Sequence, residues 1–223
     1  MTIVFLDLDG TLTDAGEGIL NSVDYALRKL SLPGLSGDNR WIVGPPLWPS
    51  FAQLGVQNED LDRAVGFYRE RYIEMGWKEN KLYDGILDQL AKLKEAGYTL
   101  CLATSKPHSY ARKITAYFGI SNFMSFEFGS ELDGRNSDKP ALLAHGLAVV
   151  GAQGERAIMV GDRVYDIQGA QANGMKALGV SYGYGGLAEL QEAGADAIIS
   201  DPQKLAETVS GLFAPVRKPN DWY

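Results

Sequence analysis

Apolar residues fall into short continuous runs over much of the chain. The first run, residues 3–6, ends at Asp7 and is typical of a strand buried on both faces of a parallel sheet. From residue 84 onwards, similar runs alternate with helical spacing and predict strands at 98–103, 124–128, 157–160, 176–180 and 196–199. This alternation predicts an α/β fold, a Rossmann-like parallel sheet sandwiched by helices.

Residues 15–83 follow a different pattern, in which apolar positions recur every three or four residues and no strand pattern appears. One helix is expected from about Ile19 to a stop at Pro33-Gly34, and another at about 59–75. Between them, Gly44-Pro45-Pro46 predicts a rigid turn or loop.

The two patterns divide the chain. We expect residues 1–14 and 84–223 to form the α/β core and residues 15–83 to form an inserted all-helical unit. The tail after Ala214 carries two prolines and several charges, so we expect a loosely packed end.

Composition narrows the possible partners and cofactors. The chain has 223 residues, 45% of them hydrophobic, and a formal net charge of -7. The negative charge argues against a nucleic acid polymer or an anionic membrane as the main partner. Cys101 is the single cysteine and there are two histidines, which excludes an internal disulfide and a Cys-rich or His-based metal cluster. An acidic protein would need a cation if it were to handle phosphates, and this is a first hint of a metal.

No targeting or membrane segment is expected. The first strand reaches Asp7 too soon for the apolar core of a signal peptide. No run approaches the roughly 18 apolar residues of a membrane span. We therefore expect a cytoplasmic protein.

Two carboxylates follow the first strand directly. Side chains alternate along a strand, so Asp7 and Asp9 are expected to point to the same side at its carboxyl end, where open α/β sheets bind ligands. Gly10 allows the backbone to approach a ligand closely. An ordinary Asp-Gly turn, in which Asp9 caps the loop, is the alternative.

Other predicted strand ends also carry polar groups. Thr104 and Ser105 follow one strand, Lys139 begins a helix after a polar loop, and Asp162 follows a third apolar run, with Asp166 four residues later. Taken singly, Thr104 could cap a helix, Lys139 could be a solvated first-turn residue, and Asp162 and Asp166 could be a cap and a first-turn acid. A parallel sheet would bring all of these strand ends together.

As a set, these residues resemble the haloacid dehalogenase-like hydrolase superfamily. The first motif of that superfamily is Asp7-Leu8-Asp9-Gly10-Thr11, the second is Thr104, the third is Lys139, and the fourth is the segment from Gly161 to Asp166. The insertion at 15–83 is similar to the helical cap of the phosphoglycolate phosphatase-like branch. Within that branch, Val43–Leu47 and Tyr182–Gly185 look most like phosphoglycolate phosphatases and 5'-nucleotidases.

The resemblance implies a phosphatase mechanism for Asp7 and Asp9. Asp7 would attack phosphorus and form an aspartyl-phosphate, and Asp9 would donate a proton to the leaving oxygen and later take one from water. Mg²⁺ would be held by Asp7, Asp162 and the main-chain carbonyl of Asp9, with Asp166 in an outer-sphere or water-mediated contact.

The remaining motif residues would bind the phosphate of the substrate, a small phosphorylated metabolite such as phosphoglycolate or a nucleotide. Thr104 and Lys139 would hold the phosphoryl oxygens. Main-chain N–H groups near Gly10, Thr11 and Ser105, and the side chain of Lys106, would complete the phosphate contacts.

Several alternatives stay open from the sequence. An acid at Asp9 favours a phosphatase over a dehalogenase, because a halide leaving group needs no proton. A phosphomutase of the same superfamily, a receiver-like phospho-acceptor module without turnover and a non-catalytic binder are the alternatives. Trp48, beside the Gly-Pro-Pro turn, could touch the leaving group or pack the cap. The expected oligomeric state is monomer or homodimer.

Overall fold

The computed structural model describes residues 1–214, and its centre is a six-stranded parallel sheet in the order β5-β4-β1-β6-β7-β8. The strands are β1 Ile3–Leu6, β4 Thr99–Pro107, β5 Phe126–Ser130, β6 Ala157–Gly161, β7 Lys176–Val180 and β8 Ala197–Ile199. β1 is fully buried between β4 and β6. The chain continues to β4 on one side of β1 and later to β6 on the other, and such a reversal opens a ligand-binding crevice at the carboxyl ends of the strands.

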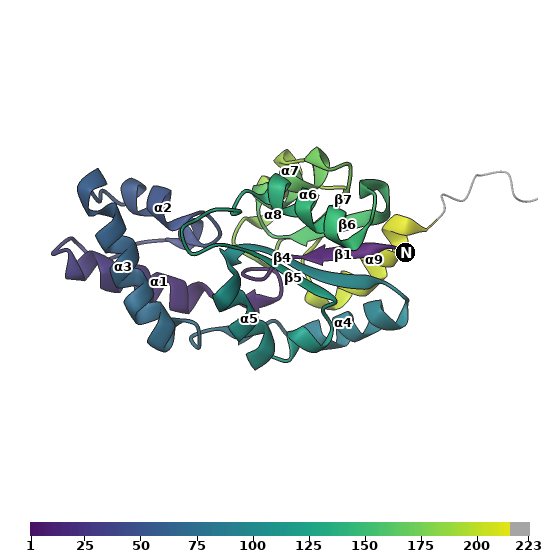
Figure 1. Ribbon diagram of the computed structural model, residues 1–223, viewed down its shortest axis with the longest axis horizontal. Coiled ribbons are helices and arrows are strands. Elements are labelled where there is room, and N and C mark those ends of the chain that lie inside the picture. The colour runs from purple at the N-terminus through teal and green to yellow at the C-terminus, as the bar shows by residue number, and fades with distance from the viewer. Residues whose placement is uncertain (215–223) are drawn as a thin grey trace, which may run out of the picture.

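Helices cover both faces of the sheet (Figure 1). One layer consists of α4 Ile86–Glu95, α5 His108–Tyr117 and α9 Leu205–Phe213, and the other consists of α6 Lys139–Val150, α7 Val164–Ala172 and α8 Gly186–Glu192. Alternate residues of β1 pack against the two layers. Val4 and Leu6 belong to the apolar cluster with α4, α5 and α9, and Ile3 and Phe5 belong to the cluster with α6, α7 and α8. The predicted parallel sheet between two helical layers is confirmed.

The chain between β1 and α4 forms a helical unit at one end of the sheet (Figure 1). Its helices are α1 Gly16–Lys29, α2 Leu47–Gln53 and α3 Leu61–Arg71, and α3 continues into a π-helical turn at Tyr72–Gly76. The chain enters the unit through β2 Thr13–Asp14 and leaves it through β3 Lys81–Leu82, and these strands pair antiparallel.

Short 3₁₀ turns occur in both parts of the chain. Two lie in the helical unit, at Arg40–Ile42 and Asn58–Asp60, and the others lie at Ile120–Asn122, Gly154–Arg156 and Pro202–Lys204.

The helical unit differs from the sequence-based expectation at two elements. β3 lies inside the segment in which no strand was expected, because two residues are too few to show an alternating pattern. α2 begins at Leu47, directly after the Gly-Pro-Pro turn, where no helix was expected. Pro49 lies in the first turn of α2, where its missing N–H costs no helical hydrogen bond.

Two strand boundaries also differ. β4 continues to Pro107 instead of ending near 103, with a shift in register between Thr104 and Pro107. β5 covers Phe126–Ser130, two residues later than expected. The tail predicted after Ala214 lies outside the described residues. Among residues 1–214, no helix has both the length and the apolar character needed to cross a membrane.

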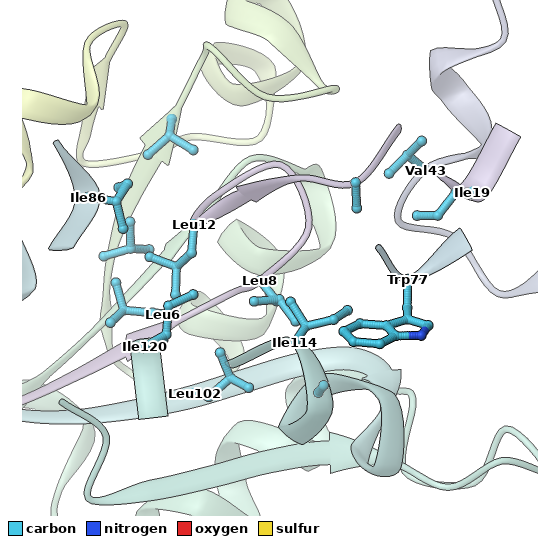
Figure 2. Close-up of a cluster of buried hydrophobic side chains, with 14 of the residues drawn as sticks. Leu6, Leu8, Leu12, Ile19, Val43, Trp77, Ile86, Leu102, Ile114 and Ile120 are labelled. Carbon is cyan, nitrogen blue, oxygen red and sulfur yellow. The ribbon is translucent and has the colours of Figure 1, made fainter. Parts of the chain in front are cut away.

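Two leucines fix the loop that follows β1. The side chains of Leu8 and Leu12 are fully buried in the cluster that also contains Ile114 of α5 (Figure 2). The carbonyl of Leu8 accepts hydrogen bonds from the amides of Leu12 and Thr13 at 2.9 and 3.0 Å. The loop that carries Asp9 is therefore anchored in the core on both sides.

Candidate active site

The loop after β1 and the end of β6 come into close contact. Asp7 extends the sheet, since its amide donates to the carbonyl of Val160 at 2.9 Å. Gly10 has a φ of +83°, and a Cβ at this position would lie 2.2 Å from Oδ2 of Asp162. Only glycine tolerates both this left-handed backbone and this approach. The turn therefore brings the first and fourth motifs together.

Three buried carboxylates meet at this contact. Asp7, Asp162 and Asp166 each place one oxygen within 4.8 Å of the others, and Asp162 is fully buried. Burial, together with the nearby Asp166 and Asp7, raises the pKa of Asp162 well above its ordinary value. Oδ1 of Asp162 is buried without a hydrogen-bond partner among residues 1–214. Oxygen atoms gathered in this way are suited to a hard divalent cation.

Lys139 is the basic group of the cluster. Its Nζ lies 3.1 Å from Oδ1 of Asp7, 2.7 Å from Oδ1 of Asp166 and 3.0 Å from the carbonyl of Ala103. Burial disfavours its charge, but the carboxylates of Asp166 and Asp7 outweigh burial and raise its pKa above the ordinary value. Lys139 is 4% exposed, so the alternative of a solvated first-turn lysine is wrong. The residue before Lys139, Asp138, is the N-cap of α6, and its side chain accepts a hydrogen bond from the amide of Ala141 at 3.0 Å.

Asp9 has a different partner. Its Oδ2 lies 2.6 Å from Nζ of Lys106, and its Oδ1 is buried without a hydrogen-bond partner in the described part of the chain. Burial raises the pKa of Asp9, although the ammonium of Lys106 acts against this shift. A carboxyl with a raised pKa is suited to donate a proton near neutral pH.

The end of β4 supplies the second motif. Thr104 is buried and lines a small cavity together with Asp7, Asp9 and Lys139. It does not cap α5, because the N-cap position of that helix is Pro107. The alternative of a capping threonine is therefore wrong.

Some expected phosphate contacts are engaged elsewhere. The amides of Gly10 and Thr11 donate to the carbonyls of Thr13 and Leu8 at 2.8 and 3.3 Å, so they shape the turn itself. The hydroxyl of Ser105 donates to the carbonyl of Ser137 at 2.9 Å. The expected donors at Gly10, Thr11 and Lys106 therefore already have partners within the protein. At Ser105 the hydroxyl is engaged, whereas the expected donor is the main-chain N–H, and the residue lines the small cavity.

Asp166 combines two of its expected roles. Its Oδ2 accepts from the amide of Arg163 at 3.1 Å, which caps α7, while Oδ1 faces Lys139. Burial raises the pKa of Asp166 to about 6, although the charge of Lys139 opposes this shift. The first-turn position and membership of the charged cluster therefore do not exclude each other.

The sequence did not single out two residues that hold the site together. The amide of Tyr184 donates to Oδ2 of Asp162 at 2.7 Å. Arg163 donates from Nε to Oε1 of Glu189 at 2.9 Å and from its guanidinium to the carbonyl of Val43 in the helical unit. The Tyr182–Gly185 segment and the fourth motif were visible in the sequence, but the partner of each group depends on how the loops pack.

Comparison with known proteins agrees with this geometry. A family model described as haloacid dehalogenase-like hydrolase matches residues 3–180. The 5'-nucleotidase of Pseudomonas aeruginosa is 42% identical over 191 residues, which cover 84% of this chain and 86% of that protein. The tyrosine-protein kinase PtkA of Mycobacterium tuberculosis is 41% identical over 184 residues, which cover 82% of this chain but only 63% of that longer protein.

A solved structure of a related protein is also similar to this chain. A predicted phosphatase from Clostridium acetobutylicum superposes with a TM-score of 0.88 at 36% identity, covering 94% of this chain and 98% of that one.

Proposed function

The chain belongs to the haloacid dehalogenase-like hydrolase family and is a phosphatase of that family, and from this premise we propose that it hydrolyses small phosphate monoesters with Mg²⁺ through a phosphorylated Asp7. The observation that carries the proposal is the cluster of Asp7, Asp162 and Asp166, in which Asp7 and Asp166 also pair with the ammonium of Lys139. Substrates of phosphoglycolate or nucleotide type are proposed because two relatives are named a 5'-nucleotidase and a phosphoglycolate phosphatase.

The donor set is suited to magnesium. Mg²⁺ prefers one or two carboxylates together with substrate oxygens and water. Asp7, Asp162 and the main-chain carbonyl of Asp9 would hold it, with Asp166 in an outer-sphere or water-mediated contact. The Oδ1 atom of Asp162, which has no partner among residues 1–214, is an available ligand atom. When bound, the ion neutralises the acids and lets an anionic nucleophile approach an anionic phosphate.

The side chains would then divide the reaction into two steps. A bond forms between a carboxylate oxygen of Asp7 and phosphorus, the bond to the leaving oxygen breaks, and Asp9 gives that oxygen its proton. Water next attacks phosphorus, Asp9 takes one of its protons, and phosphate leaves with Asp7 restored as a carboxylate. Lys139 and Thr104 hold the phosphoryl oxygens as charge moves between them.

We also propose that residues 15–83 act as a cap on this site. A cavity lies between the helical unit and the ends of β4 and β5, with Asp9 and Lys106 in its wall. A cover over a reaction centre excludes bulk water and selects the substrate. A cytoplasmic monomer or homodimer remains our proposal for the working form.

Steady release of inorganic phosphate tests the proposal. A panel of monoesters is assayed with and without Mg²⁺, with Asp7→Asn as the control. We expect many phosphates per chain from at least one ester, only with the metal, and none from Asp7→Asn. A single phosphorylation without turnover would indicate a receiver-like module. Formation of an isomeric phosphate ester would indicate a phosphomutase.

A further inference from the structure

A cavity of about 100 Å³ lies beside the carboxylate cluster. Asp9 and Lys106 line both this cavity and the smaller one that contains Asp7 and Lys139. In the proposed reaction the phosphoryl group lies at Asp7 and the ester oxygen lies at Asp9. The larger cavity is therefore where the rest of the alcohol lies.

Aromatic rings from the helical unit and α5 line this cavity. Tyr68 and Tyr72 stack with centroids 5.3 Å apart and planes at 11°, and Tyr110 meets Tyr72 edge-on at 5.4 Å. Trp48 of α2 adds a further ring. Such walls offer faces and edges for packing against another aromatic ring. At about 100 Å³ the cavity is smaller than one of about 150 Å³ that takes up benzene, so it offers room for at most one ring.

The cations in the wall already have partners. Nζ of Lys106 lies 2.6 Å from Asp9, and the guanidinium of Arg69 donates to the carbonyl of Leu132 and lies 5.3 Å from the ring centroid of Trp48. Glu131 adds a negative charge to the lining. Of the two substrate types proposed above, the one whose leaving group carries a carboxylate, phosphoglycolate, is therefore poorly matched to this wall, and the choice narrows to the other.

Tyr72 lines the cavity and carries a polar group that is not used within the described residues. The residue is 1% exposed, and its hydroxyl is buried without a hydrogen-bond partner in residues 1–214. Nζ of Lys106 lies 4.8 Å from the ring centroid, so the amine that pairs with Asp9 also fixes this ring. A buried hydroxyl without a partner gains a hydrogen bond when a ligand supplies an acceptor.

We propose that this cavity selects phosphate monoesters whose alcohol carries a flat aromatic ring, with Trp48 and the tyrosines packing against the ring and the Tyr72 hydroxyl as a specificity-determining contact. The proposal rests on the phosphatase activity proposed above. The ring belongs either to an arylmethyl alcohol or to a nucleoside, and the ring lies closer to the ester oxygen in the first than in the second.

Four alkyl esters with similar leaving oxygens separate these cases: benzyl phosphate, uridine 5'-monophosphate, glycerol 3-phosphate and phosphoglycolate, assayed with Mg²⁺. We expect kcat/KM for at least one ring-bearing ester to exceed both ring-free esters by about tenfold, the scale of stacking one ring on an aromatic side chain. Preference for benzyl phosphate places the ring next to the ester, and preference for the nucleotide places it one sugar away.

Variants test the wall itself. Trp48→Leu is expected to lower kcat/KM for the preferred ring-bearing ester, through KM, about tenfold more than it lowers kcat/KM for glycerol 3-phosphate. Tyr72→Phe is expected to raise KM for the nucleotide about fivefold, the loss of one hydrogen bond, and to leave benzyl phosphate unchanged. Tyr117→Phe, at an exposed tyrosine outside the cavity, is the matched control.

The outcomes are distinguishable. A ring-free ester as the best substrate, or an equal loss on all four esters in Trp48→Leu, overturns the ring-binding cavity and leaves the phosphatase intact. Hydrolysis of none of the four in the presence of Mg²⁺ contradicts the proposed function instead.

Discussion

Asp7 and Asp9 are one residue apart in the chain, yet their surroundings differ. Asp7 lies 3.1 Å from Lys139 and shares a cluster with two other acids. Asp9 is buried beside Lys106, and burial raises its pKa. Two neighbouring carboxyls in unlike surroundings can act as nucleophile and proton donor in one site.

Asp9→Asn tests the proton-transfer role. Asparagine keeps the shape of the side chain but cannot exchange a proton, so we expect kcat to fall by about 10²–10⁴-fold. Magnesium affinity should stay near that of the wild type, because the proposed ligand at this position is the main-chain carbonyl. Steady-state kinetics and calorimetry measure the two quantities, with Asp88→Asn on α4 as the control. Unchanged turnover would refute the role of Asp9 as acid and base.

Asp162→Asn separates metal binding from folding. The amide oxygen can still accept from the amide of Tyr184, but the negative charge is lost. We expect Mg²⁺ affinity to fall by at least about tenfold. The metal-free protein should melt at a higher temperature, since a buried charge without its cation is costly. Wild-type affinity in calorimetry would remove Asp162 from the ligand set.

At the scale of elements, the Tyr182–Gly185 segment connects the carboxylate cluster to the start of the helical unit. The hydroxyl of Tyr184 donates to Oδ1 of Asp14 at 2.6 Å and accepts from the amide of Gly16 at 2.7 Å. A Cβ at Gly183 would lie 2.4 Å from Cβ of Asp162. The side chain of Tyr184 therefore contacts the start of the helical unit, while the neighbouring Gly183 packs against Asp162 of the carboxylate cluster.

Two variants of this segment should therefore behave differently. Tyr184→Phe removes the hydroxyl and keeps the main-chain donor to Asp162, so we expect about 1–2 kcal/mol lower unfolding free energy at normal magnesium affinity. Gly183→Ala pushes on Asp162 and should weaken magnesium binding. Denaturant unfolding measures the unfolding free energy of each variant, and calorimetry measures its magnesium affinity. Equal loss of magnesium affinity in both variants would contradict this division.

The sequence predicts the elements that have a clear apolar pattern and misses two that lack one. The apolar run at 3–6 and the helical spacing of α1 are strong patterns, and both elements form as expected. β3 has two residues and α2 follows two prolines, so neither has enough pattern to be recognised.

Within the site, the sequence predicts which residues gather but not how they pair. The four motifs end neighbouring strands or begin the next helix, and sheet topology alone brings Asp7, Lys139 and Asp162 together. The Lys106–Asp9 pair depends on the register shift at the end of β4 and on a side-chain conformation. Residue spacing in the sequence predicts neither the register shift nor the side-chain conformation.

For the whole molecule, the buried acids make stability depend on pH. Burial raises the pKa of Asp166 to about 6 from an ordinary 3.8, against the opposing charge of Lys139, and burial also raises that of Asp162. A carboxyl with a higher pKa in the folded state binds more protons when folded. Its contribution to stability is therefore full below about pH 3.8 and is lost as the pH rises through about 6.

Magnesium should reverse this loss. We expect the contribution of these acids to the melting temperature of the metal-free protein to fall between about pH 5 and pH 7.5. We expect Mg²⁺ to raise the melting temperature more at the higher pH, because protons no longer compete with the ion for the carboxylates. Differential scanning calorimetry at both pH values measures it, and Asp162→Asn should abolish most of the magnesium effect. An equal shift at both pH values would contradict the account.

The most direct test of the whole account is mass spectrometry of the enzyme quenched during turnover of its best ester with Mg²⁺. We predict that the peptide containing Asp7 gains the mass of one phosphoryl group, that the gain disappears as substrate is exhausted, and that Asp7→Asn shows neither the gain nor turnover. Sustained phosphate release with Asp7 unmodified throughout, or with Asp7→Asn still active, would contradict it.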